Sequence, residues 1–273
     1  MPEGPEIRRA ADRIARAIEG QLADEVFFAF PRLHEWSETL RGRRVAAVEP
    51  RGKALLVRFD GGVNVYSHNQ LYGRWFVVPR GRSPSTTRQL RFAVHTTNGS
   101  ALLYSASDID VLSDEELIEH PFLRKLGPDV LDGRTRAATV ARRLREPRFA
   151  GRSLGALLLD QELVAGLGNY LRSEILFVAG LLAERRPRDL DERELAALAD
   201  AIVTIARRAY RTGGVTNDPD DVRQLKAEGV RRAGYRHFVF ARAGRPCRRC
   251  GEVVQKGETA GRRWYWCPAC QSG

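Results

Sequence analysis

The chain has 273 residues and a formal net charge of +11, from 45 lysines and arginines against 34 aspartates and glutamates. Hydrophobic residues make up 43% of the chain, enough for a folded core, and the length suggests two domains. No apolar run approaches the roughly 20 residues of a membrane span. The N-terminal MPEGPEIRR is not followed by an apolar stretch, so we expect no secretory signal.

The basic excess is concentrated at one end of the chain. Residues 231–273 contain ten basic and two acidic side chains. A basic surface of this kind serves either solubility or the binding of a polyanion such as nucleic acid.

The first predicted helix has Pro5 and Glu6 in its first turn and Gly20 past its end. Short segments rich in valine and phenylalanine follow, separated by turn signals such as Gly61-Gly62 and Asn98-Gly99. We expect strands at 26–30, 44–48, 54–59, 63–67, 75–78, 92–97 and 101–105. This spacing is typical of a sandwich or barrel.

The pattern changes after about residue 112. Ser113 and Glu116 form the sequence signature of a capping box, and the His-Pro and Gly-Pro pairs at 120–128 indicate a linker. From Arg134 onward the chain is predicted to be helical, with apolar segments at 154–163, 169–182 and 191–211. Residues 215–234 are polar and rich in glycine, so we expect a mobile loop there.

All the cysteines lie near the C-terminus, as two C-x-x-C pairs at Cys247, Cys250, Cys267 and Cys270. Four thiolates at this spacing predict one structural zinc ion with no open position for catalysis. Two disulfides are the alternative, although they require an oxidising compartment and strained short loops. Residues 252–256 and 262–266 between the pairs are predicted to form a β-hairpin that presents arginines.

The extreme N-terminus contains groups suited to covalent chemistry. Removal of Met1 would leave Pro2 with a free secondary amine, which attacks an aldehyde carbon to give an iminium. Glu3 and Glu6 lie one helical turn apart and would flank this amine as acid and base groups. The alternative is that the segment is only a helix cap with acids that complement the helix dipole.

Other candidates are ambiguous when each is taken alone. Asn169, after Gly166 and Gly168 at a helix start, suits a phosphate site or a tight helix–helix turn. Lys53, which follows Arg51-Gly52 at the start of a strand, reads on its own as a solvated surface lysine. His68 in the segment YSHNQLYG suits a structural role better than a catalytic one.

Together these segments resemble the family of formamidopyrimidine-DNA glycosylase and endonuclease VIII. The matching segments occur in order along nearly the whole chain: MPEGPEIRRAAD at 1–12, RGKALL at 51–56, YSHNQLYG at 66–73, LLYSASDI at 102–109, HPFL at 120–123, LLLDQ at 157–161, GLGNYLRSEIL at 166–176 and the cysteine pairs with YWCPxC.

The resemblance implies a multidomain α+β protein with an N-terminal β-sandwich and flanking helices. A C-terminal helical domain would contain a helix–two-turn–helix and a zinc ribbon held by the four cysteines. We expect the sandwich domain at 1–118, a linker at 119–134, the helix–two-turn–helix domain at 135–236 and the zinc-finger β-hairpin at 237–273.

The resemblance also implies excision of a damaged base from duplex DNA, followed by β,δ-elimination at the abasic site. Pro2 is similar to the family's nucleophile, Glu3 to its acid/base, and Glu6 and Glu174 to further active-site carboxylates. The residues that resemble phosphate-binding or DNA-contacting positions are Lys53, Asn169, Arg262 and, next to it, Arg263.

Gln70, Leu71 and Tyr72 resemble the loop with which the pyrimidine-directed branch fills the gap left by a flipped base. The purine-directed branch uses methionine, arginine and phenylalanine there. Residues 213–236 are longer and more polar than expected for the pyrimidine branch, so a purine-directed glycosylase is the rival prediction. A non-catalytic zinc-ribbon DNA-binding protein is a further alternative. We expect a cytoplasmic bacterial monomer that reaches the nucleoid through DNA.

Overall fold

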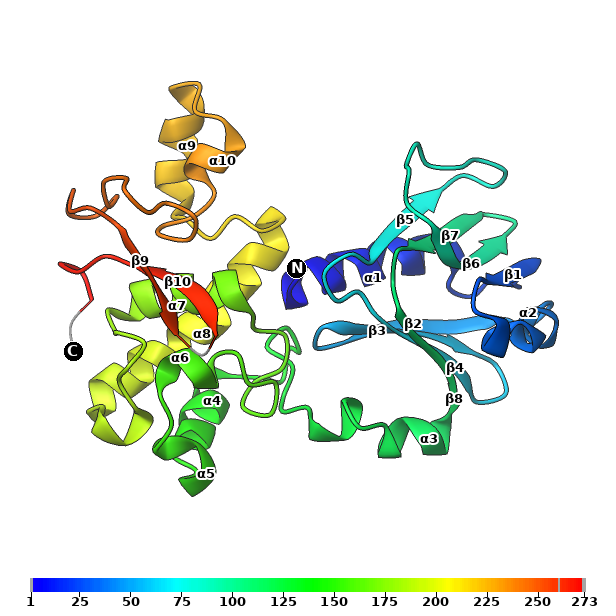
Figure 1. The fold of residues 1–273 in the computed structure, drawn as a ribbon, viewed down its shortest axis with the longest axis horizontal. Coiled ribbons are helices and arrows are strands. Elements are labelled where there is room, and N and C mark those ends of the chain that lie inside the picture. The colour runs from blue at the N-terminus through cyan, green and yellow to red at the C-terminus, as the bar shows by residue number, and fades with distance from the viewer. Residues whose placement is uncertain (1, 260, 272–273) are drawn as a thin grey trace. The chain divides into compact units, whose positions relative to one another are not determined.

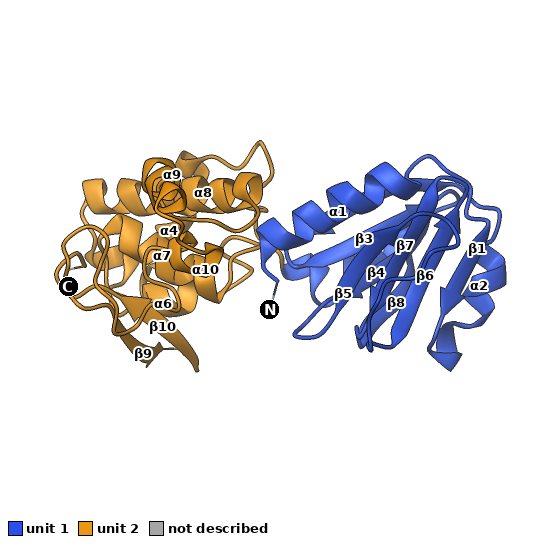
Figure 2. Cartoon of the chain, turned by 90° about the horizontal axis from the view of Figure 1, so that it is seen from above, with its two compact units in different colours: residues 1–125 blue, residues 126–273 orange. Residues whose placement is uncertain are grey.

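The chain forms two compact units, residues 1–125 and 126–273 (Figure 2). The computed structural model describes residues 2–259 and 261–271. Unit 1 contains β-sheets with helices beside them, and unit 2 contains helices and a β-hairpin (Figure 1). The finer boundaries predicted within each unit stay predictions.

Unit 1 is a sandwich of antiparallel sheets. One sheet has the order β1-β6-β7-β5, from β1 (Glu25–Phe28), β6 (Leu90–Thr96), β7 (Gly99–Tyr104) and β5 (Arg74–Val78). The other has the order β2-β3-β4-β8, from β2 (Val45–Arg51), β3 (Ala54–Phe59), β4 (Val63–His68) and β8 (Asp108–Ser113). Alternate side chains of each strand point to the same face, so Leu55, Val57 and Val65 share one buried cluster with Phe92 and Leu103. The predicted sandwich is confirmed.

The helices of unit 1 are α1 (Gly4–Ile18), η1 (Pro31–Leu33), α2 (Glu35–Leu40), α3 (Asp114–Glu119) and η2 (Leu123–Lys125). Ile7, Ile14 and Ile18 of α1 pack into the sandwich core, because their spacing places them on one helical face. The sequence predicted α1 and the strands β1 to β7 to within a few residues. It missed β8, whose alternating aspartates are unfavourable in strands.

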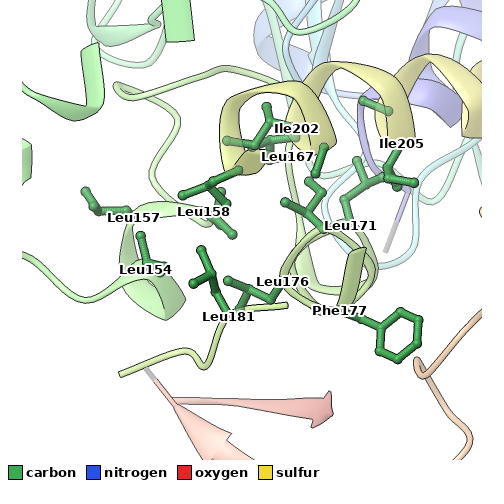
Figure 3. Packing of buried hydrophobic residues seen from close by; sticks show 14 of the residues in the cluster. Leu154, Leu157, Leu158, Leu167, Leu171, Leu176, Phe177, Leu181, Ile202 and Ile205 are labelled. Atoms are coloured by element: carbon green, nitrogen blue, oxygen red, sulfur yellow. The ribbon is translucent and has the colours of Figure 1, made fainter. Parts of the chain in front are cut away.

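Unit 2 contains the helices α4 (Ala137–Leu144), α5 (Pro147–Ala150), α6 (Leu154–Leu157), α7 (Asn169–Ala179), η3 (Pro187–Asp189) and α8 (Glu192–Thr212). Leu171 and Leu176 of α7 pack with Leu154 of α6 and Ile202 of α8 in one buried cluster (Figure 3). Turns over 158–168 join α6 to α7, which is the predicted helix–two-turn–helix arrangement. The helical prediction over 154–163 was therefore too long.

The expectation of a mobile loop at 215–234 is wrong. This segment forms α9 (Pro219–Ala227) and α10 (Arg232–Tyr235). The Asp218 side chain caps the start of α9 by accepting from the Asp220 N–H, and Pro219 occupies the first helical turn. Neither helix buries a residue, so no apolar periodicity marked them in the sequence.

The C-terminal hairpin consists of β9 (Gln255–Thr259) and β10 (Arg262–Trp266), which pair antiparallel. Its first strand begins three residues later than expected. Trp264 is buried and stacks on Trp266, with ring centroids 4.6 Å apart. Among the residues that the structure describes, no helix is long and apolar enough to span a bilayer.

Candidate functional site

The start of α1 positions two carboxylates directly after Pro2. Glu3 is the N-cap residue and is only 3% exposed. Its N–H donates to Glu6 Oε2 at 3.1 Å, and the two residues form a reciprocal capping box. The cap that the sequence suggested is therefore present, and it holds both carboxylates next to Pro2 at the positive end of the helix dipole.

Lys53 lies in the two-residue turn between β2 and β3, beside His68 at the end of β4. Ala54, which follows Lys53, is the register partner of His68. Burial lowers the pKa of His68; the positive charge of Lys53 lowers it further, and the carboxylate of Asp108 opposes both effects. A neutral imidazole at this position can accept a hydrogen bond.

The turn over residues 69–73 joins β4 to β5, and we call it the wedge turn. It exposes 59% of Leu71 and 69% of Tyr72, while Asn69 is buried. Gly73 N–H donates to Asn69 O at 2.7 Å and closes the turn. The wedge turn, the turn with Lys53 and the start of α1 lie at the same end of unit 1 (Figures 1 and 2).

In unit 2, Asn169 at the start of α7 is tied to the hairpin strand β10. Its Nδ2 donates to Arg263 O at 2.8 Å. Arg172, one helical turn later, is fully buried and donates to Asn169 Oδ1 at 2.9 Å. Arg172 also donates to the carbonyls of Arg262 and Arg263, at 3.1 and 3.2 Å, and to Thr259 O at 3.0 Å.

The side chains of Arg262 and Arg263 are exposed, while their backbone is held by α7. The predicted DNA-contacting residues include Asn169 and these arginines, and the structure ties Asn169 to the strand that carries them. The sequence prediction did not include Arg172, whose side chain holds that strand in place. The available signal was an arginine inside the apolar run of α7, where an unpaired charge would be costly.

Glu174 is fully buried in α7, and donors surround its carboxylate. Oε1 accepts from the N–H groups of Val239 and Phe240, at 2.9 and 2.8 Å. Oε2 accepts from Phe238 N–H at 2.8 Å and from the Thr216 hydroxyl. Through these hydrogen bonds Glu174 anchors the backbone of residues 238–240, which follow α10.

The cysteine side chains converge at the base of the hairpin. The four sulfurs lie within 4.8 Å of one another. Cys247 Sγ is 3.8 Å from Cys270 Sγ, and Cys250 Sγ is 3.4 Å from Cys267 Sγ. Disulfide sulfurs are about 2.05 Å apart, so these cysteines are not paired as disulfides. A tetrahedral metal with thiolate bonds of about 2.3 Å places sulfurs about 3.8 Å apart, so the cluster fits one metal ion.

The cluster is also fixed to the rest of unit 2. Gln271 is buried, and its Oε1 accepts from Cys267 N–H at 2.9 Å. Its Nε2 donates to Leu181 O at 2.8 Å. The end of the hairpin with the cysteine cluster and the strand carrying Arg262 are thus both attached to the region around α7.

Both units match models of one protein family. Residues 1–107 match the formamidopyrimidine-DNA glycosylase N-terminal domain, and residues 126–220 match the formamidopyrimidine-DNA glycosylase H2TH domain.

Curated relatives match over almost the whole chain. Endonuclease 8 from Escherichia coli O17:K52:H18 (strain UMN026) is 49% identical over 271 residues, which cover 99% of this chain and 100% of that protein. Endonuclease 8 from Shigella sonnei (strain Ss046) is 48% identical over 271 residues, which again cover 99% of this chain and 100% of that protein.

Solved structures of lower identity share the fold. Lactococcus lactis Fpg in complex with DNA containing an oxidised pyrimidine has a TM-score of 0.80 and 23% identity, and the match covers 100% of both chains. The Lactococcus lactis Fpg complex with DNA containing an abasic site has a TM-score of 0.80 and 23% identity, covering 99% of this chain and 100% of that one.

Proposed function

This chain belongs to the formamidopyrimidine-DNA glycosylase and endonuclease VIII family, and from that premise we propose which of its residues carry out the reaction. The protein is a base-excision-repair enzyme, a DNA glycosylase that also acts as an AP lyase. Its substrate is duplex DNA with a damaged base or an abasic site. We assign it to the pyrimidine-directed branch because of its identity with endonuclease 8. It acts as a monomer in the bacterial cytoplasm, on the nucleoid.

Pro2 is the nucleophile of the proposed mechanism. With Met1 removed, its amine nitrogen bonds to deoxyribose C1′ as the bond from C1′ to the base breaks and the base leaves with a proton. Glu3 donates a proton to the sugar ring oxygen, so the ring opens and an iminium forms. Loss of a C2′ proton then breaks the C3′–O bond and expels the 3′ phosphate. Loss of a C4′ proton breaks the C5′–O bond and expels the 5′ phosphate.

The other predicted residues hold the DNA for this reaction. The Glu6 carboxylate accepts from the Glu3 N–H and so fixes the backbone of Glu3. The phosphates that flank the lesion are bound by Lys53, Asn169 and Arg262. Gln70, Leu71 and Tyr72 fill the gap that the flipped nucleotide leaves in the stack. Glu174 contributes by anchoring the backbone at 238–240.

The cluster of Cys247, Cys250, Cys267 and Cys270 holds one structural zinc ion. Four thiolates are the donor set that zinc prefers in closed sites, and the sulfur separations fit it. The ion stabilises the hairpin, which keeps Arg262 near Asn169. Arg263 adds positive charge on the opposite face of β10, since neighbouring residues in a strand point to opposite faces.

The observation that carries the proposal is the start of α1, where Pro2 directly precedes a buried glutamate in a chain 49% identical to endonuclease 8. The test is borohydride trapping on DNA with an abasic site, because only an iminium is reduced to a stable adduct. A chain that keeps Met1, in which the Pro2 nitrogen is locked in a peptide bond, should lose most trapping and keep most DNA affinity, since phosphate contacts supply it. An unchanged trapping yield would exclude Pro2 as the nucleophile.

A second measurement tests the choice of lesion. Excision of 5-hydroxyuracil and thymine glycol should exceed excision of 8-oxoguanine in the same duplex sequence. Faster excision of 8-oxoguanine opposite cytosine would make the enzyme purine-directed and leave the lyase mechanism intact.

A further inference from the structure

The wedge turn is held by groups that lie outside it. Gln70 N–H donates to His68 Nδ1 at 3.3 Å. Ser107, in the turn between β7 and β8, donates its hydroxyl to Gln70 Oε1 at 3.1 Å. Arg88, just before β6, donates from Nη1 to Tyr72 O at 2.6 Å. The first and last residues of the proposed wedge are therefore each tied to a different loop of unit 1.

The two supporting loops are also joined to each other. Ser105 N–H donates to Gln89 O at 2.9 Å, so the segment with Arg88 is joined to the turn with Ser107. Since Arg88 and Ser107 come from different strand connections, their contacts fix the wedge turn from two sides.

The wedge turn depends on such support because of its own conformation. Gln70 adopts a φ of +46°, a left-handed backbone that residues other than glycine rarely adopt. Leu71 and Tyr72 are mostly exposed, so burial of their side chains does not hold the turn in place. Besides the Gly73–Asn69 bond that closes the turn, hydrogen bonds from neighbouring loops stabilise it.

We propose that Arg88 and Ser107 are positioning residues that preset the wedge turn before DNA binds, so that Leu71 and Tyr72 enter the stack without first being ordered. This inference rests on the proposed wedge function of residues 70–72. A turn that is already ordered avoids the conformational entropy cost of ordering it while the base is being flipped. Arg88 and Ser107 would thereby act on base opening and leave the chemistry at Pro2 unaffected.

The variants that test this are Arg88→Ala and Ser107→Ala, and Arg82→Ala is the matched control. Arg82 is an exposed arginine in the same connection between β5 and β6. Arg88 and Ser107 are also exposed, so the variants should fold, and thermal melting of each checks this. Ser107→Thr keeps the hydroxyl and should restore activity.

Excision of 5-hydroxyuracil from duplex DNA is measured in single turnover at saturating enzyme. Each alanine variant should lower the rate about tenfold, the effect of losing one hydrogen bond of ordinary strength. Cleavage of a single-stranded abasic site should stay within about twofold of wild type, because no stack has to be opened. Arg82→Ala should match wild type in both assays.

A double-mutant cycle separates positioning from direct DNA contact. Adding Arg88→Ala to the Leu71→Ala, Tyr72→Ala background should cost no further activity if Arg88 acts through the wedge. Additive losses would overturn the proposal. The salt dependence of DNA affinity gives a second test. If its slope falls by about one in Arg88→Ala, Arg88 contacts a phosphate directly and the proposal is overturned.

The same series distinguishes failure of this inference from failure of the wedge function. If Leu71→Ala, Tyr72→Ala keeps full duplex excision, residues 71 and 72 are not a wedge and both ideas fail. If that double variant is impaired while Arg88→Ala and Ser107→Ala equal wild type, only the positioning role is wrong.

Discussion

Replacing Glu174 by glutamine tests whether this carboxylate anchors the backbone or acts on the substrate. One glutamine oxygen can still accept from Val239 and Phe240. The amide group then faces the Phe238 N–H, a second donor, while the Thr216 hydroxyl can rotate to accept. The substitution thus leaves the Phe238 N–H and the glutamine N–H facing it without acceptors, and it removes the charge from the remaining hydrogen bonds.

The expected loss of stability follows from these contacts. An unsatisfied buried donor costs about 1–3 kcal/mol, and losing the charge weakens each remaining bond by roughly 1 kcal/mol. Glutamine avoids the desolvation cost of a buried carboxylate, so we expect a net loss of about 2–4 kcal/mol. For a unit of this size the melting temperature should fall by roughly 10 °C.

The assay pairs circular-dichroism melting of the full chain with strand cleavage at an abasic site. Glu184→Gln is the control, because it removes the same charge from an exposed position in the same unit. If Glu174 is an anchor, Glu174→Gln should melt early and regain much of its activity well below its melting transition. A variant that melts like wild type but cleaves at no temperature would refute this reasoning and make Glu174 a catalytic carboxylate.

Three further outcomes are expected in unit 2. Arg262→Ala should weaken DNA binding and lower the salt slope by about one, while Arg263→Ala, on the opposite face of β10, should change both less; equal effects in fluorescence-anisotropy titrations would contradict this. Metal analysis should find one zinc per chain, and Cys267→Ser should lose it together with the near-UV signal of the hairpin tryptophans. A fully active zinc-free protein would exclude a structural role. Burial lowers the pKa of His237 to about 4 in the folded chain. Between about pH 6.5 and pH 4 the imidazole is therefore protonated in the unfolded chain and neutral in the folded one. The free energy of unfolding should drop by roughly 3 kcal/mol as the pH falls through this range. His237→Asn should flatten this dependence in urea titrations, and an unchanged pH profile would contradict it.

Local signals in the sequence determined much of this protein. Pro5 and Glu6 mark the start of α1, and Asp191 with Glu194 forms the capping box of α8. Alternate residues of β3 and β4, such as Leu55, Val57 and Val65, share one face, which packs into the sandwich core. The spacing of the cysteines predicted a metal cluster, which the sulfur positions fit. Each signal lies within one continuous stretch of chain, so it can be recognised without knowledge of the fold.

Only the tertiary structure showed which groups the buried side chains of Arg172 and Glu174 bind. Arg172 holds β10 carbonyls about 90 residues away, and Glu174 anchors N–H groups more than 60 residues away. Ser107 and Arg88 reach the wedge turn from separate strand connections. A charged side chain is stable in a core only where the fold supplies its partners. No short-range pattern specifies which distant backbone groups those partners will be.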